Sequence, residues 1–158
     1  MDRSTLEQVV RTYADMVYRL ARVHMGNPAD ADDVFQDVFL KFAEKSPDFS
    51  SEEHLRAWLI RVTLNRCRSH YRSNWWKRIA PLEDAVHAVL PAPKDPMLDE
   101  ALDKLPSRYR TVIHLHYFEN YDTSEIAALT GQRSSTVRSQ LTRARQMLAL
   151  HLKGEADA

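Results

Sequence analysis

The stretch "TSEIAALTGQRSSTVRSQLTRARQML", residues 123–148, decides how the C-terminal part of this chain folds. Its apolar residues follow helical spacing in two runs, with Gly131 between them. A glycine there supplies the left-handed backbone conformation that ends many helices. Four small or branched apolar residues would form the contact between the two helices: Ile126, Ala127, Val137 and Leu141. The stretch therefore predicts a helix-turn-helix, in which Ala144 and Leu148 continue the buried stripe.

The second of these helices carries basic and hydroxyl side chains and no acidic one. Between Ile126 and Lys153 there are five Lys or Arg residues and no Asp or Glu. Arginine can offer a bidentate donor pair to guanine, and serine and threonine can bond phosphates or bases. We expect the DNA contacts to be Ser135, Thr136, Arg138, Ser139, Thr142 and Arg143. The alternative is a helical hairpin with a solvated basic face.

The N-terminal half also predicts helices. Apolar residues recur at three- and four-residue steps over 4–24, and Gly26-Asn27-Pro28 breaks this helix. We expect Asp30 to cap a second helix, whose apolar residues include Phe35 and Phe39. After the loop 45–54, Ser50 and Glu53 have capping-box spacing for a third helix, which would bury Trp58 and Val62.

The C-terminal half begins after a proline-rich segment. Residues 79–96 contain four prolines and no sustained period, which predicts a linker. Short helices are expected over Met97–Leu105 and from Pro106 onward. Asp122 and Glu125 form a second capping-box pair. Ser134 or Ser135 would cap a last helix that ends near Lys153. No strand pattern competes. The fold class is all-α, with two small helical domains (1–78 and 97–153), the linker 79–96 between them, a tail 154–158, and a winged-helix-like helix-turn-helix in the second domain.

The distribution of charge points to nucleic acid, although the total does not. The chain has 22 basic and 22 acidic residues, which alone argues against a DNA-binding protein. However, Arg56–Arg78 holds seven Lys or Arg and no acid, while acids gather over Asp30–Asp37 and Glu83–Asp103. A binding partner responds to the local electrostatic field rather than to the net charge of the whole chain. The single cysteine excludes an internal disulfide, and no apolar run is long enough to span a bilayer, so we expect a cytoplasmic protein.

The second basic stretch and the acidic helix are two more candidate surfaces. Four polar side chains follow one another at helical steps in the basic stretch: Arg61, Asn65, Arg68 and Arg72. Beside them, Trp75 and Trp76 could stack on unpaired bases, or instead cap a hydrophobic core or anchor the linker. On the acidic helix three side chains share a face beside exposed-looking Phe35 or Phe39: Asp33, Gln36 and Asp37. An acidic surface repels DNA, so it would meet a basic protein partner, unless it is simply solvated.

These parts, in this order, resemble the extracytoplasmic-function (ECF) group of the sigma-70 family of bacterial sigma factors. "DADDVFQDVFLKF" is similar to region 2.2, "LRAWLIRVTLNRCRSHYR" to regions 2.3 and 2.4, and the stretch from Leu105 to Leu148 to region 4. Ser69 and His70 stand where many relatives carry Asp and Leu. Gln132-Arg133 replaces a more usual turn of one apolar and one small residue.

The resemblance implies a sigma factor, which binds core RNA polymerase and recognises promoter DNA. Asp33, Gln36 and Asp37 would contact the clamp helices, and the apolar helix Val112–Phe118 the flap. The loop 46–54 would hold a flipped base of the −10 element. Arg61, Asn65, Arg68 and Arg72 would lie on −10 DNA, and the region 4 helix on the −35 element. An anti-sigma protein is a further implied partner, whereas no enzyme activity, cofactor or metal is expected.

Two other functions fit parts of the sequence. An ordinary DNA-binding regulator would use the N-terminal helices for dimerisation or sensing. A metal-dependent nuclease would need His114 and His116 with nearby carboxylates, but residues two apart on a helix point to different faces. The chain also has no glycine-rich loop to cradle a nucleotide phosphate.

Overall fold

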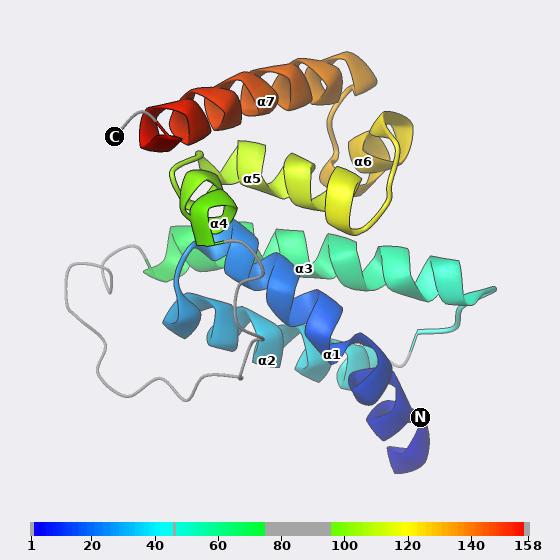
Figure 1. The fold of residues 1–158 in the computed structure, drawn as a ribbon. Coiled ribbons are helices and arrows are strands. Elements are labelled where there is room, and N and C mark those ends of the chain that lie inside the picture. Colours follow the sequence, from blue (N-terminus) through cyan, green and yellow to red (C-terminus); the bar gives the residue numbers. More distant parts are fainter. Residues whose placement is uncertain (1, 46, 75–95, 157–158) are drawn as a thin grey trace. The chain divides into compact units, whose positions relative to one another are not determined.

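The computed structural model describes residues 2–45, 47–74 and 96–156, without the side chains of residues 71–74, 96, 155 and 156 (Figure 1). Within these ranges the regular structure is helical and contains no strand, which confirms the all-α class. The chain divides into two compact units, Met1–Ala88 and Val89–Ala158. The expected linker lies outside the described residues, except that Pro96 begins a helix. No helix among the described residues is long and apolar enough to cross a membrane.

The N-terminal unit is a three-helix bundle. It consists of α1 (Arg3–Met25), α2 (Pro28–Lys45) and α3 (Glu52–Asn74), and each helix packs against the other two. Its largest fully buried side chains are Val17, Leu20, Val34, Val38, Phe42, Leu59, Ile60 and Leu64. Burying each of them contributes about 1.5–3 kcal/mol, so packing rather than helix propensity holds the bundle together.

The helix ends of this unit differ from two of our expectations. Gly26 ends α1 at φ 82°, as predicted, but α2 already begins at Pro28. Asn27 therefore occupies the cap position and its Oδ1 accepts from the Asp30 N–H at 2.9 Å, so the prediction that Asp30 caps α2 was wrong. Proline suits the first position of a helix, which moves the cap to the residue before it. The third helix is likewise capped by Ser51, whose Oγ accepts from His54 N–H at 3.1 Å, rather than by Ser50.

The C-terminal unit contains the predicted helix-turn-helix. Its elements are α4 (Pro96–Asp103), α5 (Ser107–Ile113), the π-helix η2 (His114–Phe118), α6 (Thr123–Thr130) and α7 (Ser134–Ala156). The long helix α7 packs on α4, α5 and α6. Its core includes Leu105, Val112, Leu115, Ile126, Val137, Leu141 and Ala144.

Of the three helix-end features predicted near the turn, two are confirmed and one was wrong. The capping box of Asp122 and Glu125 is complete, with both reciprocal hydrogen bonds present. Gly131 ends α6 in the left-handed conformation at φ 70°. The predicted serine cap of α7 was wrong: α7 starts at Ser134, and the preceding Arg133 contributes only its carbonyl, which accepts from the Val137 N–H at 3.1 Å.

Candidate nucleic-acid interface

The first turns of α7 separate a buried face from a polar one. Val137, Leu141 and Ala144 are at most 1% exposed, which confirms the predicted stripe. All six predicted DNA contacts are exposed and lie between Ser135 and Arg143. The Thr142 hydroxyl donates back to the Arg138 carbonyl at 3.0 Å, so its free lone pairs face outward as acceptors. The helix therefore presents hydroxyl and guanidinium groups over about two turns, a length that fits a major groove.

A chain of hydrogen bonds fixes the turn before this helix. The Gln140 amide on α7 donates to Gln132 Oε1 at 2.8 Å, and Gln132 Nε2 donates to Thr130 Oγ1 at 2.9 Å. Thr130 in turn donates to the Ile126 carbonyl at 2.7 Å. Each such bond adds about 1 kcal/mol and fixes an orientation. Gln132, a departure from the family pattern, thus ties α6 to α7, a role that the sequence did not reveal because its partner on α7 lies eight residues away.

Arg145, next to the buried Ala144 on α7, contacts a tyrosine of η2. Arg145 Nε donates to the Tyr117 hydroxyl at 2.6 Å, and its guanidinium lies 5.5 Å from the centre of that ring. On α5, Arg108 lies beside Tyr109, with its Nη2 3.5 Å from the Tyr109 hydroxyl. The positive charges of Arg108 and Arg143 lower the pKa of the Tyr109 phenol from its ordinary value of 10.0, because they favour the phenolate.

The helix α3 presents the predicted row of polar side chains. Arg61, Asn65 and Arg68 are exposed, while Val62 is buried. The Arg72 backbone continues α3, but its side chain lies outside the described residues, as do Trp75 and Trp76 entirely. The row therefore extends for at least two turns, from Arg61 to Arg68, on one helix face.

The loop before α3 is organised by aromatic rings. Phe49 stacks on Phe42 at 6.3 Å, and its edge meets Trp58 at 5.9 Å and His54 at 5.2 Å. Trp58 is half-buried in this cluster rather than fully in the core. Ser46 lies outside the described residues, and Glu52–His54 already belong to α3. The part of the predicted base pocket that is a loop is thus residues 47–51, in which Asp48 and Ser50 are exposed.

The acidic face of α2 is exposed as predicted, but its apolar component was misassigned. Asp33, Gln36 and Asp37 are exposed, whereas Phe39 is buried at 8% exposure. Phe39 packs against Phe35 with ring centres 5.1 Å apart, so the proposal of an exposed aromatic at position 39 was wrong. The exposed apolar side chain is Leu40, at 61%. Leu40 lies two residues after Val38, off the buried stripe of Val34, Val38 and Phe42, so helical spacing places it on the outer face.

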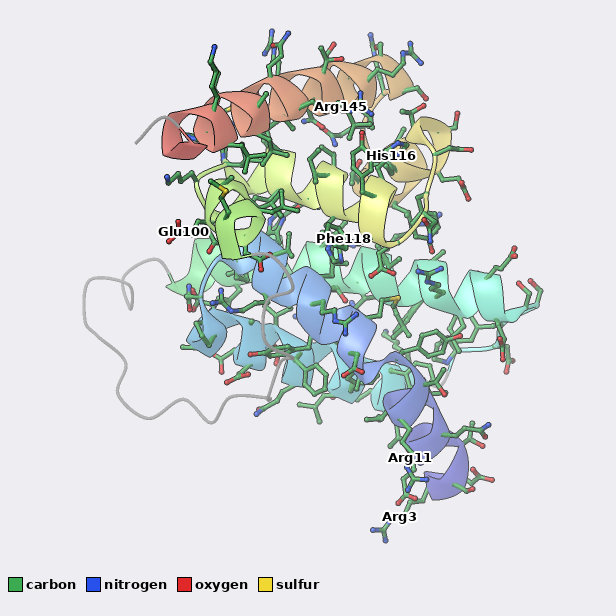
Figure 2. The ribbon with its side chains drawn as sticks, in the orientation of Figure 1. Arg3, Arg11, Glu100, His116, Phe118 and Arg145 are labelled. Atoms are coloured by element: carbon green, nitrogen blue, oxygen red, sulfur yellow. The ribbon has the colours of Figure 1, made fainter. Side chains whose placement is uncertain are left out.

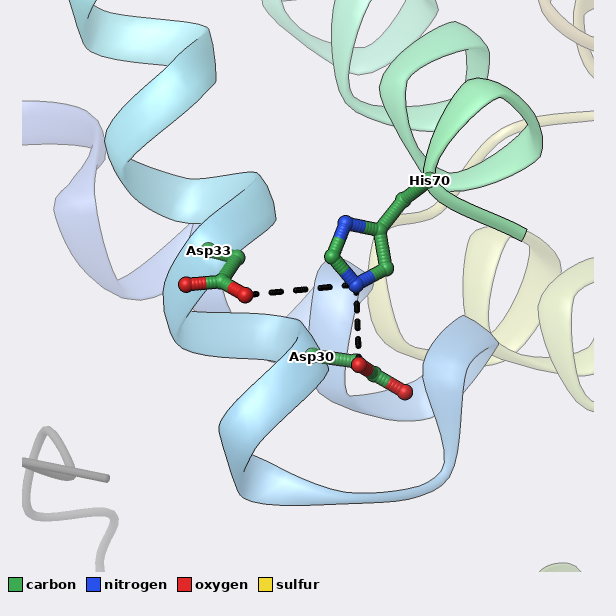
Figure 3. Close-up of side chains that lie close together, drawn as sticks. All are labelled: Asp30, Asp33 and His70. Carbon is green, nitrogen blue, oxygen red and sulfur yellow. Dashed lines mark hydrogen bonds and ion pairs between the residues drawn. The ribbon is translucent and has the colours of Figure 1, made fainter. Parts of the chain in front are cut away.

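A buried histidine–aspartate contact joins this acidic helix to α3 (Figure 3). His70 Nε2 lies 2.8 Å from Asp30 Oδ1 and 4.0 Å from Asp33 Oδ2. The His70 and Asp30 side chains are 8% and 10% exposed, and Asn27 Nδ2 donates to the other Asp30 oxygen at 2.7 Å. Three ligand-type atoms gather here within 4.8 Å. However, 2.8 Å is the length of a direct hydrogen bond, shorter than the roughly 3.3 Å between two ligand atoms of a tetrahedral zinc ion.

The C-terminal unit also bears an apolar groove of about 440 Å³ between α4, η2 and the end of α7. Tyr117 and Phe118 are 52% and 57% exposed there, and Arg145 borders the groove (Figure 2). Other lining residues are Leu98, Leu102, Ile113, Leu148, Ala149 and Leu152. Of the expected flap-binding helix, Val112 and Leu115 are core residues, whereas Tyr117 and Phe118 at the end of η2 are exposed.

The two histidines of η2 have separate environments. His114 is buried, stacks on Phe118 at 5.5 Å and lies 3.2 Å from a Glu119 oxygen. His116 Nδ1 lies 2.8 Å from the Tyr121 carbonyl. Neither arrangement brings the two rings to one point, which agrees with the argument against a shared metal.

The all-α fold and the exposed polar face of α7 define the chain as a helical protein of the helix-turn-helix class. Residues 9–77 match the family model of sigma-70 region 2, and residues 96–148 match that of sigma-70 region 4. The chain therefore belongs to the sigma-70 family of RNA polymerase sigma factors, which confirms the resemblance found in the sequence.

Known proteins support this assignment over the whole chain. RNA polymerase sigma factor SigV of Bacillus subtilis is 32% identical over 143 residues, which cover 87% of this chain and 85% of that protein. ECF RNA polymerase sigma factor SigE of Mycolicibacterium smegmatis is 32% identical over 157 residues, 92% of this chain and 61% of that protein. Among solved structures, CnrH in complex with the cytosolic domain of CnrY is 28% identical, with a TM-score of 0.66 over 99% of this chain and 92% of CnrH.

Proposed function

We propose that this chain binds core RNA polymerase, recognises the −35 and −10 elements of a promoter and opens the duplex to start transcription. The observation that carries the proposal is the polar face of α7, with six exposed hydroxyl and guanidinium side chains opposite a buried stripe. The chain acts as a non-catalytic factor in the cytoplasm. It needs no chemical step, because capture of unstacked bases can drive strand opening at a few base pairs.

The recognition helix α7 reads the −35 element in the major groove. Arg138 is exposed near its N-terminus, where a bidentate contact to guanine is worth about 1–3 kcal/mol of discrimination. Arg138→Ala should therefore reduce transcription from a −35-dependent promoter while core polymerase binding is kept. Lys153→Ala, which removes a positive charge from the far end of the same helix, is the matched control. Equal loss of polymerase binding in Arg138→Ala would contradict this role.

The α3 face and the loop 47–51 engage the −10 element. Asn65 lies in the middle of the exposed row from Arg61 to Arg68, and its amide would contact a strand as it separates. Asn65→Ala should impair promoter opening, measured by permanganate reactivity of thymines, more than duplex binding measured by gel shift. An equal loss in both assays would remove Asn65 from the opening step.

The acidic face of α2 and the groove of the C-terminal unit bind the polymerase. Asp33, Gln36 and Asp37 supply polar contacts to the clamp helices, with Leu40 as an apolar one, and Tyr117 and Phe118 meet the flap. Asp37→Lys reverses one exposed charge, so it should weaken retention of the chain on core polymerase in a pull-down. Unchanged retention in Asp37→Lys would remove the acidic face from this role.

The test of the proposal as a whole is reconstitution. Core polymerase plus this chain should initiate transcripts at defined starts on genomic DNA, whereas an ordinary regulator would give none without another sigma factor. CnrH is seen bound to the cytosolic domain of CnrY, and we propose that a protein of anti-sigma type likewise restrains this chain. It would compete with core polymerase for the same two surfaces.

A further inference from the structure

The turn before the recognition helix contains a polar contact that contributes little to stability. Gln140 Nε2 donates to Gln132 Oε1 at 2.8 Å, and the Gln132 backbone N–H donates to the Ala127 carbonyl at 3.0 Å. Gln132 is therefore attached to α6 by its main chain and to α7 by its side chain. Among the described residues, no group bonds to Gln140 Oε1, which is buried. A buried acceptor without a hydrogen bond costs at least about as much free energy as one hydrogen bond returns, so this contact, the glutamine tie, adds little net stability.

The glutamine tie holds α7 from the side opposite its base-reading groups. Gln140 lies two residues from both Arg138 and Thr142, which is about 200° around an α-helix. Its side chain therefore lies beside the buried stripe that contains Val137 and Ala144. Apolar contacts in that stripe are not directional, whereas a hydrogen bond fixes both a distance and an angle. The tie is thus suited to set the rotation of α7 about its own axis.

A small rotation of α7 would change what its outer side chains reach. Side chains extend about 5–6 Å from a helix axis, so a rotation of about 10° moves their ends by about 1 Å. That displacement exceeds the range of about 0.5 Å over which N–H···O distances vary in protein hydrogen bonds. A bidentate contact from Arg138 to a guanine therefore requires a fixed rotation of the helix.

We propose that Gln132 and Gln140 are positioning residues for promoter recognition. Through the glutamine tie they fix the rotation of α7, and so decide which base pairs Arg138 and Thr142 discriminate. The inference rests on the proposed function and goes beyond it, because neither glutamine needs to contact DNA in this role.

Transcription from a set of −35 variants measures this role. Core polymerase with the full chain is offered one promoter in which each base pair of the −35 element is substituted in turn. A base pair read by a bidentate contact should be discriminated about 5- to 150-fold, and Arg138→Ala identifies it by losing that discrimination. Gln140→Met removes both polar atoms at similar length, so discrimination at the same base pair should fall by about 5-fold or more.

Two matched comparisons separate the tie from the substitution itself. Gln146→Met makes the same replacement at an exposed position of α7 and should leave discrimination unchanged. Gln132→Glu keeps an oxygen that accepts from Gln140, so it should retain the discrimination that Gln132→Met loses. Its added negative charge would weaken binding to all the promoters alike and leave the ratios between them unchanged.

Stability distinguishes positioning from a structural role. Gln140→Met removes the unpaired buried acceptor together with the tie, so it should melt no lower than Gln146→Met. A lower melting temperature, or an equal loss of transcription from every promoter in the set, would make the tie a structural contact and overturn the proposal. Unchanged discrimination in Gln140→Met and Gln132→Met would also overturn it, while the effect of Arg138→Ala would still support promoter recognition by α7. If the wild-type chain initiates from none of these promoters, both proposals fall.

Discussion

Replacing His70 with alanine removes one partner of the buried pair that joins α2 to α3. The His70 and Asp30 side chains are 8% and 10% exposed and their atoms are 2.8 Å apart. Removing one member of a buried pair costs about 3–5 kcal/mol, because the other is left desolvated without its partner. Asp30 keeps the bond from Asn27 at 2.7 Å, so we expect the lower end of that range, about 3 kcal/mol.

A double-mutant cycle isolates the pair from the loss of packing. Asp30→Asn keeps the shape and removes the charge, so His70→Ala should cost less in that background. The expected coupling is about 1.5–3 kcal/mol, the net value of hydrogen bonds that involve a charged group.

Urea unfolding followed by tryptophan fluorescence measures the cycle. Trp58 packs against Phe42 and Phe49, so its fluorescence reports the N-terminal unit. A loss below about 0.5 kcal/mol in His70→Ala, or a coupling near zero, would show that the pair does not hold α2 against α3.

The remaining predictions concern a thiol, a turn and an exposed leucine. Burial raises the pKa of Cys67 from 9.0 to about 12, so the thiol ionises at lower pH in the unfolded chain than in the folded one. The free energy of unfolding should therefore fall by up to about 1.4 kcal/mol per pH unit above pH 9. Urea titrations of Cys67→Ala should not show this dependence on pH. Gly131→Ala meets no atom within 4 Å, so its cost of about 1 kcal/mol, seen by calorimetry, is backbone strain at φ 70° alone. Leu40→Ser should leave the melting temperature unchanged but weaken retention on core polymerase, because Leu40 is 61% exposed.

Features fixed by neighbouring residues could be predicted from the sequence. The Asp122–Glu125 box, the left-handed Gly131 and the stripe from Val137 to Ala144 each depend on chemistry within a few residues. For the same reason, the exposed face of α7 followed directly from the position of its buried one. The domain boundaries and the roles of the site residues stay predictions.

The features that escaped prediction depend on contacts between distant residues. Phe39 lies at the edge of the apolar stripe of α2, and the packing of the bundle decides that it is buried. His70 meets Asp30 across 40 residues, and Arg145 reaches Tyr117 across 28. The caps at Asn27 and Ser51 were missed because several polar residues competed within one turn, and the proline and the packing selected among them.

The division of α7 into an inner stripe and an outer row has an evolutionary consequence. Since the six outward side chains contribute little to the core, they can be exchanged without unfolding the unit. A duplicated copy could therefore acquire a different set of target genes through a handful of surface substitutions. A library randomised at these six positions, with the inner three kept, would be a practical route to sigma factors addressed to synthetic promoters.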